Sequence, residues 1–328
     1  MKAAVIESAG AAPRYADFDE PKADEGHEIV SLVAAGIHPV VRSLAAGRHY
    51  GSHGIWPSIP GVDAVARMTD DTLVYTGFVT PPFGTIAERM SVPVRMRMPL
   101  PHDADPVQVA GGMNPGLSSW MPLTARKSEL DSAGRGSGLG TVLVLGVTGT
   151  AGVLAVKNAL ALGATRVIGA GRDENRLRTV TGLGAETVQL TGGSETDATN
   201  IRSALSGVSP SIVLDFVWGA PAEATFDALA RRGLDEDEGD VAYVQIGSLA
   251  GAEASVPSAL LRSTRIRISG SGAGSSSMAV LMREVPVYLG LIAAGTVDVP
   301  TSVFPLSRIA DAWTAAGASG TRAVIVPD

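Results

Sequence analysis

The pattern of hydrophobic and polar positions changes character about one third of the way along the chain. Before residue 105, short apolar and β-branched runs such as MKAAVIE and EIVSLVAAGI are separated by proline, glycine and acidic residues. Many short strands with frequent turn signals predict a small β-barrel or sandwich. Beyond residue 140, strand-like and helix-like runs alternate, beginning with TVLVLG and AGVLAVKNALALG. This alternation predicts a parallel sheet covered by helices on both faces.

The end of the chain departs from this alternation. After about residue 280, a helix-like run, MREVPVYLGLIAAG, is followed by VFPLSRIADAWTAAG and a strand-like RAVIV. We expect these segments to return to the first domain. The predicted fold class is therefore α/β, with a doubly wound parallel-sheet domain over residues 114–280 and a discontinuous β-rich domain formed by residues 1–113 and 281–328. The acidic run LDEDEGD, around Asp237, is expected to be a solvated loop.

Three glycines stand between the first strand and the first helix of the alternating region. They follow a G-x-x-G-x-x-G spacing, and the last two match the end of the commoner dinucleotide-binding fingerprint. Small residues let the backbone approach a pyrophosphate closely, and the amino end of the helix offers free N–H groups to an anion. The turn is therefore predicted to bind a dinucleotide; the alternative is a tight strand–helix turn without a ligand. The candidate contacts are Gly146, Thr148, Gly149, Thr150, Ala151 and Gly152.

The next strand, RVIGAG, bears on which dinucleotide binds. NAD sites usually carry Asp or Glu about 20 residues after the glycines, where it binds the adenosine ribose. Here that position falls near Ala170 or Gly171, and Arg172 follows, with Arg176 about one turn further on. Because guanidinium groups suit a phosphate, we predict NADPH, with Arg172 as the main contact of the 2′-phosphate. Asp173 would serve NAD instead, and an ordinary charged helix start is the remaining interpretation.

Composition and charge exclude several other classes of protein. The formal net charge of -7 argues against a general binder of nucleic acid or anionic membranes. The chain has no cysteine, which excludes disulfides, thiolate metal sites and cysteine nucleophiles. No apolar run approaches the ~20 residues that span a bilayer, and MKAAVIESAGAAPRY shows no secretion signal. We therefore expect a cytoplasmic enzyme with neither nucleic-acid nor membrane partners.

Landmark motifs cover nearly the whole chain. In order, they are MKAAVIESAG, AAGIHPVVRSLAAGRHY, PGVDAVA, GTIAERMSVP, MNPGLSSW, VLVLGVTGTAG, VLDFVWG, VQIGS and VFPLSRIADAW. With these landmarks the chain resembles the medium-chain dehydrogenase/reductase superfamily, specifically its zinc-free quinone oxidoreductase branch. The resemblance implies a GroES-like barrel domain plus a Rossmann domain, with the site in the cleft between them. It also implies a homodimer formed through the Rossmann sheet edge, here near residues 265–270.

The resemblance also bears on metal binding. Zinc-dependent relatives hold a catalytic metal with Cys, His and an acid or second Cys. Ile37 and His38 stand where those enzymes place the cysteine, and Val62 and Asp63 stand where they place a His–Glu pair. Since His38 beside Asp63 does not make a three-ligand site, no zinc is expected.

The usual substrate contacts of the family are altered in this chain. Quinone oxidoreductases commonly carry Asn and Asp where GIHPVVR has His38 and Val41, and His49 replaces a tyrosine often found nearby, with Tyr50 next to it. A hydrogen-bond donor near the oxygen that gains charge during hydride transfer would lower the barrier. Tyr50 and His49 are therefore the candidate catalytic donors, and His38 and His53 are candidate substrate-binding residues. The alternatives are that these side chains only line the pocket or face solvent in a turn.

A segment before the alternating region and residues near the carboxyl ends of later strands complete the predicted site. By the resemblance, Asn114 and Ser118 in MNPGLSSW form a hinge facing the nicotinamide, although both residue types also favour helix caps. Gly247 and Ser248 follow a later strand, whose carboxyl end lines the cofactor crevice. Trp218 ends another strand and is predicted to flank the cofactor; packing in the core is the simpler interpretation.

These predictions combine into one leading function. It is a zinc-independent, NADPH-dependent oxidoreductase that transfers hydride to quinones or activated C=C bonds such as enones. An NADPH-binding sensor or structural protein with little or no turnover is the alternative from another class. A carbonyl or alcohol dehydrogenase is a third possibility, but without a metal the carbonyl lacks a strong Lewis acid.

Overall fold

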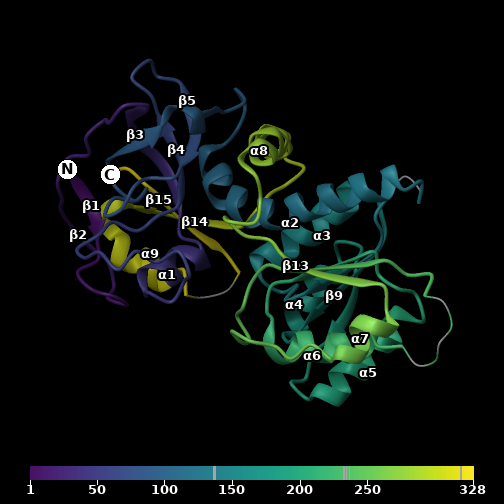
Figure 1. Ribbon diagram of the computed structural model, residues 1–328. Helices are drawn as coiled ribbons and strands as arrows, with labels where there is room; N and C mark the ends of the chain where they lie inside the picture. Colours follow the sequence, from purple (N-terminus) through teal and green to yellow (C-terminus); the bar gives the residue numbers. More distant parts are fainter. Residues whose placement is uncertain (136–137, 232, 234, 236, 318–319) are drawn as a thin grey trace. The chain divides into compact units, whose positions relative to one another are not determined.

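A computed structural model describes residues 1–328 except 136–137, 232, 234, 236 and 318–319. The chain forms two compact units, one made of Met1–Pro115 with Arg283–Asp328 and the other of Gly116–Met282 (Figure 1). Each boundary lies two residues beyond the position expected from the sequence. The first unit is thus assembled from both ends of the chain.

Mostly antiparallel strands make up the first unit. Its main sheet has the order β14 (Thr301–Pro305), β15 (Arg322–Val326), β3 (His27–Gly36), β4 (Asp63–Arg67), β5 (Leu73–Gly77) and β7 (Met98–Pro99), and β6 (Arg89–Pro93) also pairs with β3. A separate antiparallel pair is formed by β1 (Lys2–Val5) and β2 (Arg14–Asp17). Because β15 pairs with β3, the last segment of the chain completes this unit, as the sequence predicted.

The core of the first unit lies between its strands and two helices. Along β3, Val30 and Leu32 are buried whereas Ser31 between them is exposed, so one face of the strand meets the core. The same core includes buried side chains of α1 (Pro39–Ala45) and α9 (Ile309–Ala315). Short 3-10 helices cover Val94–Met96 and Leu306–Arg308.

Within the described part of the second unit, six strands form one sheet, and all of them run parallel. Their order is β10 (Glu186–Gln189), β9 (Ala164–Gly171), β8 (Gly140–Leu145), β11 (Ile212–Asp215), β12 (Val241–Gln245) and β13 (Ile266–Gly270). The chain moves outward from β8 to β10, then restarts at β11 on the other side of β8. The strand order therefore reverses between β8 and β11. In such doubly wound sheets, ligands bind outside the carboxyl ends of the strands at this reversal.

Helices cover both faces of this sheet. Val142 and Val144 of β8 join one core cluster with α3 (Thr150–Ala161) and α4 (Glu174–Thr181), whereas Leu143 and Leu145 join the opposite cluster. That second cluster contains α5 (Ser194–Leu205), α6 (Gly219–Leu229) and α7 (Ser258–Ser263). Burial on both faces explains why the strand sequences read as continuous apolar runs.

Helix α2 (Pro106–Ser132) runs through Gly111, Gly112 and Pro115 without a break. A Cβ atom on Gly111 would lie 3.0 Å from Thr301, and one on Gly112 would lie 3.3 Å from Val299. The two glycines thus allow close packing against α2 rather than ending it. A further helix, α8, covers Met278–Ala293.

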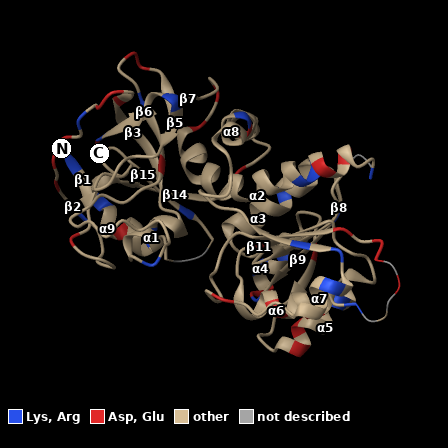
Figure 2. Cartoon of the chain, viewed as in Figure 1, with Lys and Arg blue, Asp and Glu red and all other residues tan. Residues whose placement is uncertain are grey.

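Charged side chains are interspersed over both units, with no large patch of one sign in the view of the described residues (Figure 2).

The prediction that the acidic loop is solvated is wrong at Asp237. This residue is buried and accepts hydrogen bonds from the backbone N–H groups of Gly239 (2.9 Å) and Arg265 (2.7 Å). Residues 234 and 236 of that loop lie outside the described part. Among the described residues, none of the helices has the length and apolar character that a membrane crossing requires.

Candidate functional site

Two of the three glycines are required by the shape of the turn between β8 and α3. Gly146 has a φ of 81°, in the left-handed region that favours glycine. A Cβ atom on Gly152 would lie 2.4 Å from the carbonyl oxygen of Gly146 and 2.6 Å from the Cα atom of Val147. The packing of α3 against its own turn therefore excludes a side chain at residue 152.

Gly149 is not required by packing in this way. It is exposed, its φ is -85°, and a Cβ atom there would meet no atom nearer than the Gly146 carbonyl oxygen at 3.6 Å. Gly149 is also the N-cap of α3 and supplies no side-chain acceptor to the first N–H groups of the helix. The missing side chain leaves open space beside free N–H groups. Together with Thr148, Thr150 and Ala151, this turn has the properties of an anion site.

The turns after three strands touch one another at the carboxyl edge of the sheet. A Cβ atom on Gly146, after β8, would lie 2.8 Å from Val217, after β11. One on Gly247, after β12, would lie 2.6 Å from the Phe216 carbonyl oxygen. Ser248 follows and is exposed. The structure thus brings Gly247 and Ser248 to the same edge as the glycine turn, where the strand order reverses.

Trp218 lies at this edge and also packs on the core. Its ring makes edge contacts with Phe226 and Tyr243, at centroid distances of 5.9 and 6.3 Å. Its φ is 56°, which is uncommon for a residue other than glycine and persists only where the surroundings impose it. Here the backbone N–H groups of Val217 and Trp218 both donate to Oδ1 of Asp215 at 2.8 Å. Packing, the simpler interpretation of Trp218, is therefore present, and its proposed contact with a cofactor stays a prediction.

Asp215 is a fully buried carboxylate that holds this turn. Its Oδ2 atom accepts a hydrogen bond of 2.6 Å from the hydroxyl of Tyr243. Burial raises the pKa of Asp215, although the hydrogen bonds that it accepts oppose the rise. Burial and the neighbouring Asp215 charge raise the pKa of Tyr243 well above its ordinary value. No sequence pattern indicated this pair, because its two members are 28 residues apart.

Two arginines follow β9, and they differ in their contacts with the rest of the protein. Arg172 is exposed, and its guanidinium makes no ion pair or hydrogen bond within the described part of the chain. Arg176 lies against the glycine turn, since its Nη1 atom is 3.4 Å from the Thr148 carbonyl oxygen. Asp173 caps α4 by accepting the Arg176 N–H at 3.1 Å, and its other oxygen lies 3.5 Å from Arg176 Nε. The acid that would have favoured NAD is thus already bonded within the protein.

Asn114 and Ser118 both lie inside α2, so neither is a helix cap. They are four residues apart and therefore share one face of the helix. Both are half-buried, whereas the other residues from 111 to 120 are buried. The capping alternative is wrong, and a role for this pair at the nicotinamide stays a prediction.

The segment after α1 presents aromatic side chains to solvent. The rings of His49 and Tyr50 lie 4.1 Å apart, centroid to centroid, and those of His53 and Trp56 lie 5.9 Å apart. Tyr50 is 77% exposed, and His53 is also exposed. Burial lowers the pKa of His49 below its ordinary value. Three of the residues predicted to meet the substrate therefore lie in one surface segment of the first unit.

His38, the fourth predicted residue, is 1% exposed and offers no surface to a ligand in this structure. Its Nε2 atom lies 3.3 Å from Oδ1 of Asp63. Oδ2 of Asp63 accepts a hydrogen bond of 2.8 Å from the hydroxyl of Tyr75. The Arg322 guanidinium, also buried, donates to the Ile37 carbonyl oxygen at 3.1 Å. His38 therefore belongs to a buried polar cluster that includes two residues the sequence did not indicate.

Burial dominates the electrostatics of this cluster. It lowers the pKa of Arg322 to about 10, although the Asp63 charge opposes the fall. Burial, followed by the same charge, raises the pKa of Tyr75 well above its ordinary value. Within the described ranges, no three His, Asp or Glu side chains lie together as a metal site would require.

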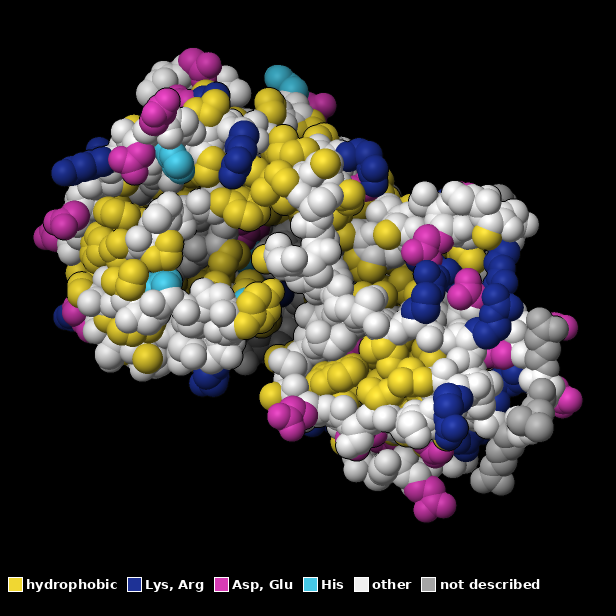
Figure 3. All heavy atoms as spheres, in the orientation of Figure 1, with side chains coloured by type: hydrophobic (Ala, Val, Ile, Leu, Met, Phe, Trp, Pro, Cys, Tyr) yellow, Lys and Arg dark blue, Asp and Glu magenta, His cyan; other side chains and the backbone are white. Residues whose placement is uncertain are grey.

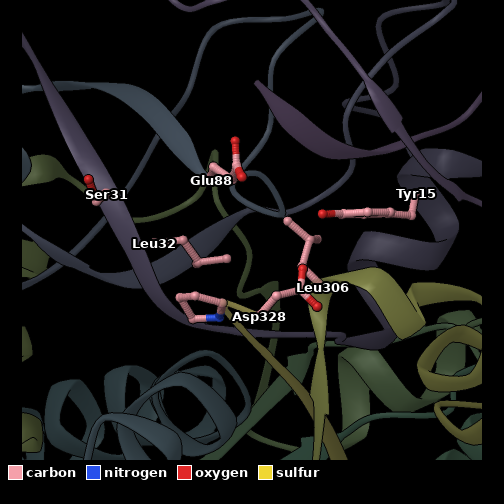
Figure 4. Close-up of a pocket in the computed structure, with 7 residues that line it drawn as sticks. Tyr15, Ser31, Leu32, Glu88, Leu306 and Asp328 are labelled. Carbon is pink, nitrogen blue, oxygen red and sulfur yellow. The ribbon is translucent and has the colours of Figure 1, made fainter.

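A separate cavity of about 240 Å³ opens in the first unit, between Tyr15, Ser31, Leu32, Glu88, Leu306, Pro327 and Asp328 (Figure 4). Its two carboxylates already serve the fold. Glu88 accepts the backbone N–H of Lys2 at 2.7 Å, and Asp328 accepts that of Ser307 at 3.2 Å. The cavity shares no lining residue with the glycine turn or the aromatic segment.

The chain is similar in sequence to one curated protein and in fold to several solved structures. A protein of Emericella nidulans named probable NADPH-dependent quinone reductase tdiC is 31% identical over 356 aligned residues, which cover 96% of each chain. The quinone oxidoreductase of Thermus thermophilus, solved also as a complex with NADPH, is 25% identical, with a TM-score of 0.70 over 99% of this chain and 100% of that one. A 2-haloacrylate reductase shares the fold at 20% identity, with a TM-score of 0.79 over the whole of both chains. No protein-family model matches the chain.

Proposed function

Because the chain belongs to the medium-chain dehydrogenase/reductase superfamily, in its quinone oxidoreductase-like branch, we propose that it transfers hydride from NADPH to quinones or other activated C=C bonds. The observation that carries this proposal is the free Arg172 guanidinium at the end of β9, in the same unit as a glycine turn with open space at Gly149. The sequence relative is named for NADPH-dependent quinone reduction, and the Thermus enzyme was solved with NADPH.

The described residues fit the phosphates of NADPH. The pyrophosphate would lie against Gly149 and the amino end of α3, where the N–H groups lack a side-chain acceptor. Arg172 and Arg176 would hold the 2′-phosphate, which is absent from NADH. Because Asp173 is bonded to Arg176 and to the α4 backbone, it does not present a free carboxylate to the adenosine ribose.

We assign the nicotinamide end to Asn114 and Ser118 on α2 together with Gly247 and Ser248 after β12. Their amide, hydroxyl and backbone groups would bind the carboxamide and its ribose. Trp218 would contribute its backbone at the same edge of the sheet. When bound, the dihydronicotinamide supplies the hydride.

The acceptor gains negative charge on oxygen as it takes hydride at carbon. A preorganised donor near that oxygen stabilises the charge. Tyr50 supplies an exposed hydroxyl that would donate a hydrogen bond and a proton to the acceptor oxygen. His49 would do the same when its imidazole is protonated, and His53 would bind the substrate. We propose no metal in this step. Because His38 is buried, it would not contact the acceptor directly.

A homodimer through β13 is also proposed. This strand pairs only with β12 among the described strands, so its other edge is unpaired. Ile266 and Ile268 on β13 are partly exposed, Leu261 on α7 is 52% exposed, and hydrophobic side chains gather near β13 and α6 (Figure 3). An apolar sheet edge of this kind fits a second copy of the chain.

The test is to follow NADPH absorbance with a panel of quinones and enones. Steady consumption that depends on the acceptor, with the hydroquinone or saturated product formed in equal amount, supports the proposal. Tight NADPH binding without consumption across the panel would overturn it and favour a sensor or structural protein. Simple ketones and aldehydes in the same panel test for a carbonyl reductase.

A further inference from the structure

The turn after β11 has a backbone conformation that its residue type does not favour. Trp218 has a φ of 56° and a ψ of -161°. This combination lies at the border of a region that is occupied almost only by glycine, and residues held in such regions cluster at active sites and ligand sites. The surrounding fold must therefore impose this conformation, and the strain at Trp218 points to a role in binding.

The carboxylate of Asp215 imposes the conformation of this turn. Its Oδ1 atom accepts two consecutive backbone N–H groups, those of Val217 and Trp218, each at 2.8 Å. Its Oδ2 atom accepts the Tyr243 hydroxyl at 2.6 Å. Asp215 and Tyr243 are both fully buried, so bulk water does not compete for these hydrogen bonds. Tyr243 on β12 thus fixes the rotation of the carboxylate, and Oδ1 fixes the turn.

The same turn is joined to the turns after the two neighbouring strands. The Val217 carbonyl oxygen accepts the N–H of Ala250 at 2.7 Å, and the Asp215 carbonyl oxygen accepts the N–H of Gly247 at 3.1 Å. Toward β8, a Cβ atom on Gly146 would lie 2.8 Å from the Val217 side chain. A displacement of the turn after β11 would therefore move the turn after β12 and disturb the packing on the glycine turn.

These three turns follow neighbouring strands, in the order β8, β11 and β12. In the proposed function, the pyrophosphate lies against the first turn and the nicotinamide ribose against the third. Because the turn after β11 is between them, on the basis of the proposed function we propose that Asp215 and Tyr243 are positioning residues for the nicotinamide end of NADPH. They keep Trp218 in its strained conformation, so the site is preorganised before the cofactor binds.

The adenosine half of the cofactor is assigned to another part of the sheet. Its 2′-phosphate is placed on Arg172 after β9, and β8 separates β9 from β11. Adenosine 2′,5′-bisphosphate contains this half and has no nicotinamide. A change at Asp215 or Tyr243 should therefore weaken the binding of NADPH more than that of adenosine 2′,5′-bisphosphate. A general loss of structure in the unit would weaken both.

The experiment compares these two ligands by calorimetric titration of the full chain. Tyr243→Phe removes the hydrogen bond that orients the carboxylate, and Asp215→Ala removes the acceptor of both backbone N–H groups. Asp215→Asn keeps an oxygen for these N–H groups and can donate its amide N–H to the Tyr243 oxygen. It therefore tests whether a side chain of the same shape rescues binding without the charge.

The matched control acts at the opposite end of the same strand. The buried Arg126 guanidinium donates a hydrogen bond of 3.1 Å to the Ser211 carbonyl oxygen, just before β11. Arg126→Met removes this bond and leaves the carboxyl edge of the sheet untouched. Thermal melting confirms that each variant is folded at the temperature of the titrations.

We expect Tyr243→Phe to weaken NADPH binding about three- to tenfold, which is part of the value of one hydrogen bond to a charged group. Its affinity for adenosine 2′,5′-bisphosphate should stay within about twofold of the wild-type value. Asp215→Ala should show the same pattern with a larger loss, and Asp215→Asn should bind NADPH within about threefold of wild type. Arg126→Met should melt at a lower temperature and keep both affinities.

Unchanged NADPH affinity in a folded Tyr243→Phe protein, or an equal loss for both ligands, would overturn the inference, whether or not Asp215→Ala folds. The proposed function is judged separately by NADPH consumption with quinones and enones. A wild-type chain that binds NADPH without consuming it overturns the function, and the titrations of the variants still decide the inference. A chain that consumes NADPH but loses both ligands equally in Tyr243→Phe keeps the function and overturns the inference.

Discussion

Replacing Gly149 by alanine should change the affinity for NADPH without destabilising the fold. The new Cβ atom would meet no protein atom nearer than 3.6 Å, and a φ of -85° is open to alanine. The change should therefore leave the fold intact, because the gain of about 0.4–1 kcal/mol from restricting the unfolded chain is offset by the poorer N-cap that alanine makes for α3. If a pyrophosphate lies against this backbone, the methyl group must displace it. Overpacking by one methyl group costs about 1–3 kcal/mol, which corresponds to a loss of NADPH affinity of about 5- to 150-fold.

The assay combines calorimetric titration with NADPH and thermal melting of the free protein. Gly152→Ala is the control, because its Cβ atom would lie 2.4 Å from a backbone oxygen and should destabilise the fold by about 1–3 kcal/mol. The expected pattern is a stable Gly149→Ala protein with weak NADPH binding and a less stable Gly152→Ala protein. Wild-type affinity in a folded Gly149→Ala protein would refute the placement of the pyrophosphate.

Three further predictions rest on single side chains. Arg172→Ala should weaken NADPH binding about tenfold, the value of one exposed charged hydrogen bond, and leave NADH binding unchanged; equal losses for both cofactors in titrations would contradict the 2′-phosphate contact. Tyr243→Phe should lower stability to urea by about 1.5–3 kcal/mol, because a buried oxygen of Asp215 loses its donor; an unchanged midpoint would count against this bond. The lowered pKa of His49 means that its stabilising contribution is complete above its ordinary pKa, near 6.5, and is lost as the pH falls through the folded value. Wild-type stability should therefore fall relative to His49→Asn, which keeps an acceptor for the Gly51 N–H, and parallel urea curves between pH 7 and 5 would contradict this.

The parallel sheet was predictable because its strand–helix pattern repeats along the sequence, and the return of the chain was predictable because its last segments depart from that pattern. Alternating strands and helices after residue 140 have the periodicity of a doubly wound fold, and the six parallel strands confirm it. Helix α2 was harder to predict, because Gly111, Gly112 and Pro115 weaken local helix propensity. The close packing of the two glycines against Val299 and Thr301 is a tertiary effect that overrides that propensity.

Site residues were predictable where their spacing from a strand indicates which part of the dinucleotide they would bind. The glycine turn and Arg172 follow from positions relative to β8 and β9. Asp173 was ambiguous because a carboxylate beside an arginine serves equally as a ribose ligand or a helix cap, and only the fold shows that it caps α4. The environment of His38 was hidden for another reason. Arg322, which donates to Ile37, is 285 residues away in sequence, so no local pattern connects them.

The most direct test of the cofactor site is a pair of calorimetric titrations of the wild-type chain, one with NADPH and one with NADH. Because the 2′-phosphate is placed on the free guanidinium of Arg172, NADPH should bind about tenfold or more tightly than NADH. Equal affinities would contradict the role of Arg172. No binding of either dinucleotide at millimolar concentration would contradict the cofactor site itself.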